Sequence, residues 1–151
     1  MSAWFRGGTG HGIRQTFGVD DWQVKRPFWW GLILLMDRDS SDVPSLRDSV
    51  VSASRSGLAV KVLHAQDVGL SDADADELVP PAQVQVVVRV GDRPPADALF
   101  RGEIDVPSGV LTVGDAEHED ALAIGPGRWA VQVDCAPRDF ADTVQVWLQA
   151  V

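Results

Sequence analysis

The sequence predicts an all-β fold: a two-sheet antiparallel β-sandwich of about eight strands, with room for one short helix. Two observations lead to this prediction. Apolar and polar residues alternate in short segments of the second half, which is the pattern of half-buried strands. Turn signals containing Gly or Pro separate these segments roughly every ten residues, a spacing typical of sandwiches and barrels. Because 151 residues match the ~100–200 of one domain, residues 1–151 are expected to form a single domain.

Six segments of the second half fit the strand pattern, because they alternate or are rich in β-branched residues. Turns are predicted at Gly91–Pro95, Pro107–Gly109 and Gly125–Gly127, since proline cannot donate to a sheet and glycine accepts turn geometries. The six predicted strands are Val84–Val90, Ala98–Asp105, Val110–Val113, Ala121–Ile124, Trp129–Cys135 and Val144–Gln149.

The first half contains two further predicted strands. Phe28–Met36 is an apolar run of nine residues without a period, which suits either a strand buried on both faces or a core helix. A strand is favoured, because Pro27 precedes the run and Gly31 would weaken a helix. Gly57–His64 alternates and predicts the second strand. Val43–Ser54 fits either a short helix or a strand with a loop.

Charge and composition bound the function. Thirteen Lys and Arg against twenty-two Asp and Glu give a net charge of -9, which argues against a protein that binds duplex nucleic acid. Residues 1–61 carry a net charge of +2, and residues 62–151 carry -11. One cysteine cannot form an internal disulfide. No apolar run approaches ~18 residues and the start lacks the order of a signal peptide, so a cytoplasmic protein without a membrane partner is expected.

The candidate catalytic groups lack the partners that their chemistry requires. A protein without enzymatic activity and without a cofactor is therefore expected. The glycine-rich run Gly7–Gly12 lacks the preceding strand and the Lys-Ser/Thr pair of a phosphate loop. Cys135 has acidic neighbours, which raise a thiol pKa and favour a structural role. His64 could act as a general base that Asp67, three residues later, orients. No suitable nucleophile is evident for this pair.

Two acidic stretches are candidate contacts for a basic partner. The first, 72–77, is predicted to be an exposed loop before two prolines. The second, 115–120, includes His118 and fits a solvated loop better than a calcium loop, because Gly114 precedes it instead of lying at its centre. The candidate partner-binding carboxylates are Asp72, Asp74, Asp76, Glu77, Asp115, Glu117, Glu119 and Asp120.

The aromatic segment Trp22–Trp30 has two interpretations. Its rings pack in the core, or some of them are exposed anchors, since Trp and Arg are enriched at interface hot spots. Trp29 and Trp30 are the candidate anchors, and Lys25–Arg26 would give them a charged rim.

Phe100–Val113 and Ala121–Val133 have a recognisable order: a strand, a glycine turn, a strand, an apolar strand, a Pro-Gly turn with an Arg and an aromatic residue, and an alternating strand. In this order the chain resembles the competence protein J family of small bacterial β-sandwich proteins. The resemblance covers about the last fifty residues and implies a β-sandwich that inhibits a partner nuclease or similar toxin without catalysis of its own. It transfers no functional residue.

The function expected from these observations is that of an immunity-type inhibitor that covers the active site of a basic toxin or enzyme. The alternative is a β-sandwich module that binds a small ligand or a sugar. A pocket lined by Trp22, Trp29 or Trp30 would favour the ligand, and a flat exposed aromatic patch would favour the protein partner.

Overall fold

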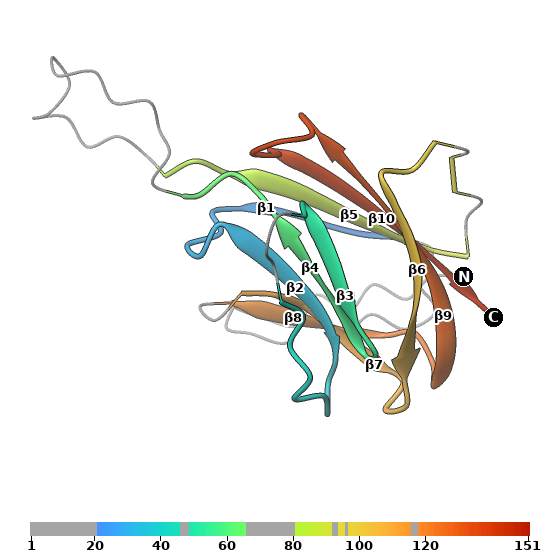
Figure 1. The fold of residues 1–151 in the computed structure, drawn as a ribbon. Helices are drawn as coiled ribbons and strands as arrows, with labels where there is room; N and C mark the ends of the chain where they lie inside the picture. Colours follow the sequence, from blue (N-terminus) through green and yellow to red (C-terminus); the bar gives the residue numbers. More distant parts are fainter. Residues whose placement is uncertain (1–20, 46–48, 66–80, 92–93, 96, 116–117) are drawn as a thin grey trace, which may run out of the picture.

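The computed structural model describes residues 21–45, 49–65, 81–91, 94–95, 97–115 and 118–151. Two five-stranded sheets pack face to face in a β-sandwich (Figure 1), which confirms the predicted fold class. The first sheet has the order β1 (Asp21–Arg26), β5 (Val84–Val90), β10 (Thr143–Ala150), β9 (Gly127–Ala136), β6 (Phe100–Val106). The second has the order β3 (Val51–Ser54), β4 (Gly57–Lys61), β2 (Leu32–Asp37), β7 (Val110–Gly114), β8 (Glu119–Ala123).

The described residues form ten strands and no helix, where about eight strands were expected, with room for one short helix. Each of the six strands predicted in the second half is present. The additional strands are β1, which lies in the aromatic segment, and β3, which lies in Val43–Ser54. Alternation was hard to detect in both, because β1 has one fully buried residue beside other aromatic residues and β3 has only four residues.

One strand pair departs from the antiparallel prediction. β5 and β10 are parallel neighbours, and every other pair within the two sheets is antiparallel. Parallel strands need a crossover, and here β6 to β9 lie between β5 and β10 in the chain. Periodicity identifies the strands but does not identify their neighbours.

The predicted strand at Phe28–Met36 is shorter than expected. β2 begins at Leu32, because residues 28–31 form a turn in which the Gly31 N–H donates to the Phe28 carbonyl at 3.1 Å. Gly31 has a φ of 65°, which glycine adopts without the steric cost of a side chain. The turn reverses the chain, so that β1 belongs to one sheet and β2 to the other.

The core lies between the sheets and is built from the alternate residues that the period-two pattern selects. In β5 and β10, Val84, Val86, Val144 and Val146 are fully buried. The inward residues of β2 and β9 pack in the same cluster, as do Trp22 and Phe28. Among the described residues, no helix is long and apolar enough to cross a membrane.

Each side of the sandwich where two edge strands meet is joined by an Arg–Asp ion pair. β1 and β8 are edge strands of different sheets, and Arg26 and Asp120 link them at 3.6 Å. At the opposite side, β6 is the edge of one sheet and β3 is the edge of the other. Arg55, directly after β3, reaches Asp105 of β6 at 3.2 Å.

Candidate protein-binding surface at the aromatic end

The turn between β1 and β2 presents two tryptophans to solvent. The Phe28 side chain is completely buried, and its carbonyl accepts hydrogen bonds from the N–H groups of Gly31 and Ala65. The two next residues point outward, so that Trp29 is 39% and Trp30 is 55% exposed. Both interpretations of the aromatic segment therefore apply, but to different residues: Trp22 and Phe28 are core residues, and the Trp29–Trp30 pair is exposed.

The loop between β7 and β8 holds this turn from the side. One carboxylate oxygen of Asp115 accepts the Trp29 backbone N–H at 3.0 Å, and the other accepts the His118 N–H at 3.1 Å. The Asp115 residue is only 6% exposed. An acidic side chain thus fixes the backbone of an exposed tryptophan, since a buried carboxylate requires hydrogen-bond donors.

Arg26 adds a second connection between the same two segments. Its Nη2 donates to the His118 carbonyl at 2.8 Å, its Nη1 lies 3.6 Å from Asp120, and its guanidinium lies over the Phe28 ring. The side chains of Arg26 and Asp120 are 17% and 12% exposed. The ion pair is therefore largely shielded from water, and removing one of its partners would leave a charge that water solvates poorly.

The expectation that 115–120 is a fully solvated acidic loop is corrected by these contacts. Asp115 and Asp120 are buried, because they bind backbone N–H groups and Arg26. Glu119 and His118 are exposed. Glu117 and the first acidic stretch, with Asp72, Asp74, Asp76 and Glu77, lie outside the described residues.

Gly114 permits the close approach of the two sides of this loop. A Cβ atom at position 114 would lie 2.0 Å from the His118 carbonyl oxygen and 2.6 Å from the Glu119 Cα. It would also lie 2.9 Å from the Arg26 Nη2 atom. Any side chain at this position would push the loop away from Arg26, so the site depends on glycine.

A third exposed aromatic residue lies at the same end of the sandwich. Phe140, in the loop between β9 and β10, is 69% exposed and has a φ of 54°, which is uncommon for a residue other than glycine. The next residue, Ala141, is buried and forms a bridge with Val62, and its carbonyl accepts the Leu63 N–H at 2.9 Å. The loop is therefore anchored directly behind the exposed ring.

Backbone contacts place Phe140 close to the tryptophans. The Val62 N–H donates to the Gly31 carbonyl at 3.0 Å, so that Gly31, Val62 and Ala141 form a row of neighbouring backbones. Val62 is antiparallel to Gly31 and parallel to Ala141. Trp30 and Phe140 therefore lie on opposite sides of this row, with two strand spacings, about 10 Å, between their chains. Phe140 was not among the predicted contacts, although it is the single aromatic residue in the polar stretch 137–142.

We call this surface the aromatic end and define it by Trp29, Trp30, Phe140, His118 and Glu119. In Figure 1 the β1–β2 and β7–β8 connections lie at the left, and the β9–β10 connection lies above them. In the described part of the chain, its three aromatic residues are those with largely exposed rings. A hollow of about 620 Å³ adjoins the β9–β10 loop and is lined by Ser49, Val50, Val51, Leu99, Phe100, Arg138 and Asp139. None of the tryptophans lines this hollow.

Of the groups considered for catalysis, the structure describes His64 and Cys135. His64 is half-buried, and a Cβ on Gly31 would lie 3.2 Å from its Cδ2. Burial raises the pKa of the Cys135 thiol to about 11, and the neighbouring Asp134 charge adds to the shift, as the acidic neighbours predicted. Asp67 and Gly7–Gly12 lie outside the described residues. Within the described ranges, no group of three or more His, Cys, Asp or Glu side chains is arranged to hold a metal ion.

Comparisons with known proteins identify the fold. No family model matches the sequence, and no curated protein matches it. The crystal structure of ComJ from Bacillus subtilis, an inhibitor of the DNA-degrading activity of NucA, matches with a TM-score of 0.55 at 10% identity over 87% of this chain and 97% of ComJ. A protein described as crocagin biosynthetic gene J has a TM-score of 0.45 at 15% identity over 85% of this chain and 95% of its own. The chain has a ComJ-like fold, as the resemblance to the competence protein J family implied.

Proposed function

We propose that this chain is a non-catalytic binding protein that inhibits an enzyme, and that the aromatic end contacts the partner. The observation that carries this proposal is the grouping of Trp29, Trp30 and Phe140 as exposed rings at one end of the sandwich. Exposed aromatic groups of this kind mark interaction surfaces, because burying them on association releases water from a large apolar area.

The backbone segments that carry the exposed rings are held in place by contacts within the chain, which favours binding of a partner. Asp115 and Arg26 hold the Trp29 turn, and Ala141 holds the Phe140 loop, by contacts within the chain. A surface that is already ordered loses less conformational entropy when a partner binds. Tryptophan also has few rotatable bonds for its large contact area, which is one reason for its enrichment at hot spots.

The charge of the chain supports a basic partner. Glu119 lies exposed beside the tryptophan turn, and the chain as a whole carries -9. Complementary charge raises the rate of encounter and disfavours acidic partners. The proposed contacts therefore include Glu119 and the acidic residues outside the described ranges. Asp115 and Asp120 act by positioning, because they are buried against the tryptophan turn and Arg26.

A nuclease is the first partner class to test, because ComJ, which has a similar fold, inhibits a DNA-degrading enzyme. The ligand-binding alternative is not favoured. Trp22 is a core residue, Trp29 and Trp30 project from a turn, and no tryptophan lines the hollow beside the β9–β10 loop. An exposed patch is the arrangement expected for a protein partner.

The experiment that tests this function compares two variants of the tagged chain in affinity capture from the source lysate. One variant replaces Trp29, Trp30 and Phe140 with Ser. The matched control replaces Val43 and Val151, which are 60% and 74% exposed elsewhere on the molecule, with Ser. We expect the wild type and the control to capture one stoichiometric protein and the aromatic variant to lose at least about tenfold in affinity for it, as hot-spot truncation does.

The captured protein is then purified and assayed for DNA degradation with increasing amounts of the chain. Inhibition that saturates at one equivalent, and that the aromatic variant no longer produces, supports the proposed function. Capture without inhibition refutes the inhibitor role. Equal capture by the aromatic variant removes the aromatic end as the binding surface.

A further inference from the structure

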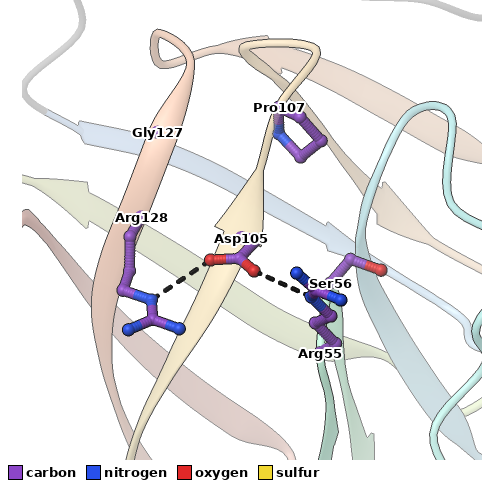
Figure 2. Close-up of a pocket in the computed structure, with 6 residues that line it drawn as sticks. All are labelled: Arg55, Ser56, Asp105, Pro107, Gly127 and Arg128. Atoms are coloured by element: carbon purple, nitrogen blue, oxygen red, sulfur yellow. Dashed lines mark hydrogen bonds and ion pairs between the residues drawn. The ribbon is translucent and has the colours of Figure 1, made fainter.

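The end of the sandwich opposite the aromatic end contains a hollow lined by two arginines. Its volume is about 480 Å³, and its lining residues are Arg55, Ser56, Asp105, Pro107, Gly127 and Arg128. We call this region the arginine end. Figure 2 shows the two guanidinium groups on either side of the Asp105 carboxylate, with Pro107 on the wall above them. The two arginines come from different sheets, since Arg55 follows β3 and Arg128 lies in β9.

Asp105 orients both guanidinium groups by their inner edges. The Nε–H of Arg55 donates to one carboxylate oxygen at 3.2 Å, and the Nε–H of Arg128 donates to the other at 3.2 Å. The backbone is fixed as well, because the Asp105 N–H donates to the Arg55 carbonyl at 2.8 Å. Two arginines from different sheets are thereby held toward one point.

Most of the donors on these arginines remain available. A guanidinium has five N–H donors, of which Nε provides one. Among the described residues, the only acidic neighbour of an Nη atom in this cluster is Glu103, whose carboxylate lies 4.0 Å from the Arg128 Nη1. The Arg55 and Arg128 side chains are 85% and 58% exposed, so these N–H groups face water. The two guanidiniums share the Asp105 carboxylate and Glu103 lies near one Nη atom of Arg128, so the cluster is close to neutral while its outer N–H donors face water.

We propose that Arg55 and Arg128 bind the phosphate group of a small anionic ligand in this hollow. A tetrahedral phosphate has enough oxygens to accept N–H groups from two guanidiniums at once, and the planar arginine fork matches this geometry. The hollow is larger than a phosphate ion, and Pro107 and Gly127 form a wall against which the organic part of a phosphate ester would pack. Asp105 is a positioning residue, because it orients both arginines and its charge opposes the ligand.

This site is independent of the proposed function, because it lies at the other end of the sandwich and shares no residue with the aromatic end. Its test therefore uses the purified full chain without a partner. The Nε–H signals of Arg55 and Arg128 are followed by NMR at constant ionic strength. Inorganic phosphate, adenosine 5′-monophosphate and acetate are titrated separately, so that free phosphate, a phosphate ester and a carboxylate are distinguished.

The variants Arg55→Gln and Arg128→Gln remove one guanidinium each. Arg128→Lys keeps the charge but removes the fork. The matched control is Arg89→Gln, since Arg89 is also a surface arginine beside a carboxylate, 3.9 Å from Asp21. We expect saturable shifts of both Nε–H signals with the phosphate compounds, at least fivefold weaker binding in the two glutamine variants and in Arg128→Lys, and no change in Arg89→Gln.

Tighter binding of adenosine 5′-monophosphate than of inorganic phosphate would identify the ligand as a phosphate ester, and equal affinity would identify it as free phosphate. Either result supports the site if the arginine variants weaken binding. Shifts that rise linearly without saturation, equal shifts with acetate, or the same loss in Arg89→Gln would overturn it.

Discussion

The aromatic end and the arginine end differ in how far their Arg–Asp ion pairs are exposed to water. At each end an Arg–Asp pair joins edge strands of the two sheets. The pair at the aromatic end, Arg26 with Asp120, is less than one-fifth exposed, whereas Arg55 at the other end is 85% exposed. The same pair of residue types is therefore part of the packed structure where water is excluded and remains accessible to a ligand where water is admitted.

The difference extends to the residues that each end presents. At the aromatic end Asp115 and Arg26 bind backbone atoms of the chain, and the exposed residues are aromatic rings together with His118 and Glu119. At the arginine end the charged groups face solvent. Burial thus decides which side chains act as support and which are available for recognition.

The change with the largest expected effect is Gly114→Ala, which breaks the support of the aromatic end. The new Cβ would lie 2.0 Å from the His118 carbonyl oxygen, a backbone atom that cannot move without opening the β7–β8 loop. We expect the free energy of unfolding to fall by about 3 kcal/mol or more, measured by urea denaturation. Partner binding through Trp29 should weaken in the same variant, because Asp115 in this loop holds the tryptophan turn.

The control for this change is Gly125→Ala in the β8–β9 turn of the arginine end. Gly125 has a φ of 102° but open space around its Cβ position, so alanine there introduces backbone strain without a clash. A loss of about 1–3 kcal/mol is expected from strain alone. If Gly125→Ala is as destabilising as Gly114→Ala, close approach is not what requires glycine at position 114.

A comparison of Arg26→Met with Arg55→Met tests the contrast between the two ion pairs. Arg26→Met leaves Asp120 and the His118 carbonyl without their cationic partner in a shielded position, and should lower the free energy of unfolding by about 2–3 kcal/mol. Arg55→Met should leave the urea midpoint unchanged within error, because that arginine is solvated. Equal effects of the two substitutions would contradict the role assigned to burial.

The smallest expected effect concerns the pKa of Asp105. The hydrogen bond from Arg55 and then that from Arg128 hold this pKa below its ordinary value of 3.8. These hydrogen bonds therefore favour the folded state at pH values above the pKa of Asp105 in the unfolded chain. Their contribution is lost as the pH falls through the pKa of Asp105 in the folded chain. In a carbon-13 NMR titration below pH 5, Arg55→Gln should raise the pKa more than Arg128→Gln does. A pKa that is the same in wild type and both variants would show that neither guanidinium stabilises the carboxylate.

Sequence patterns predicted the strands best where period-two alternation was strong. Val84–Val90 is β-branched and alternates at its ends, and this pattern identified the strand, in which Val84, Val86 and Val88 are fully buried. β1 was missed because Trp22 is its only fully buried residue, and the neighbouring aromatic residues masked its alternation. The parallel pairing of β5 and β10 was not predictable, since it depends on a crossover between distant segments.

The candidate site was likewise predicted only in part. The sequence singled out Trp29, Trp30 and Glu119, which lie on one surface in the fold. It also offered Asp115 and Asp120 as solvated contacts, and their burial depends on Arg26 and the Trp29 backbone, which are more than 80 positions away in the chain. Phe140 joined the site through the bridge between Ala141 and Val62, a contact that no local pattern encodes.

The sequence by itself determined the fold class, the locations of most strands and the acidic character of the chain, because alternation, turn residues and charge are local properties. Only the tertiary structure decided which acidic and aromatic residues are exposed, which strands are neighbours, and which arginines share a carboxylate. Those properties arise from contacts between segments far apart in the chain, where burial and hydrogen bonding set the energy of each side chain.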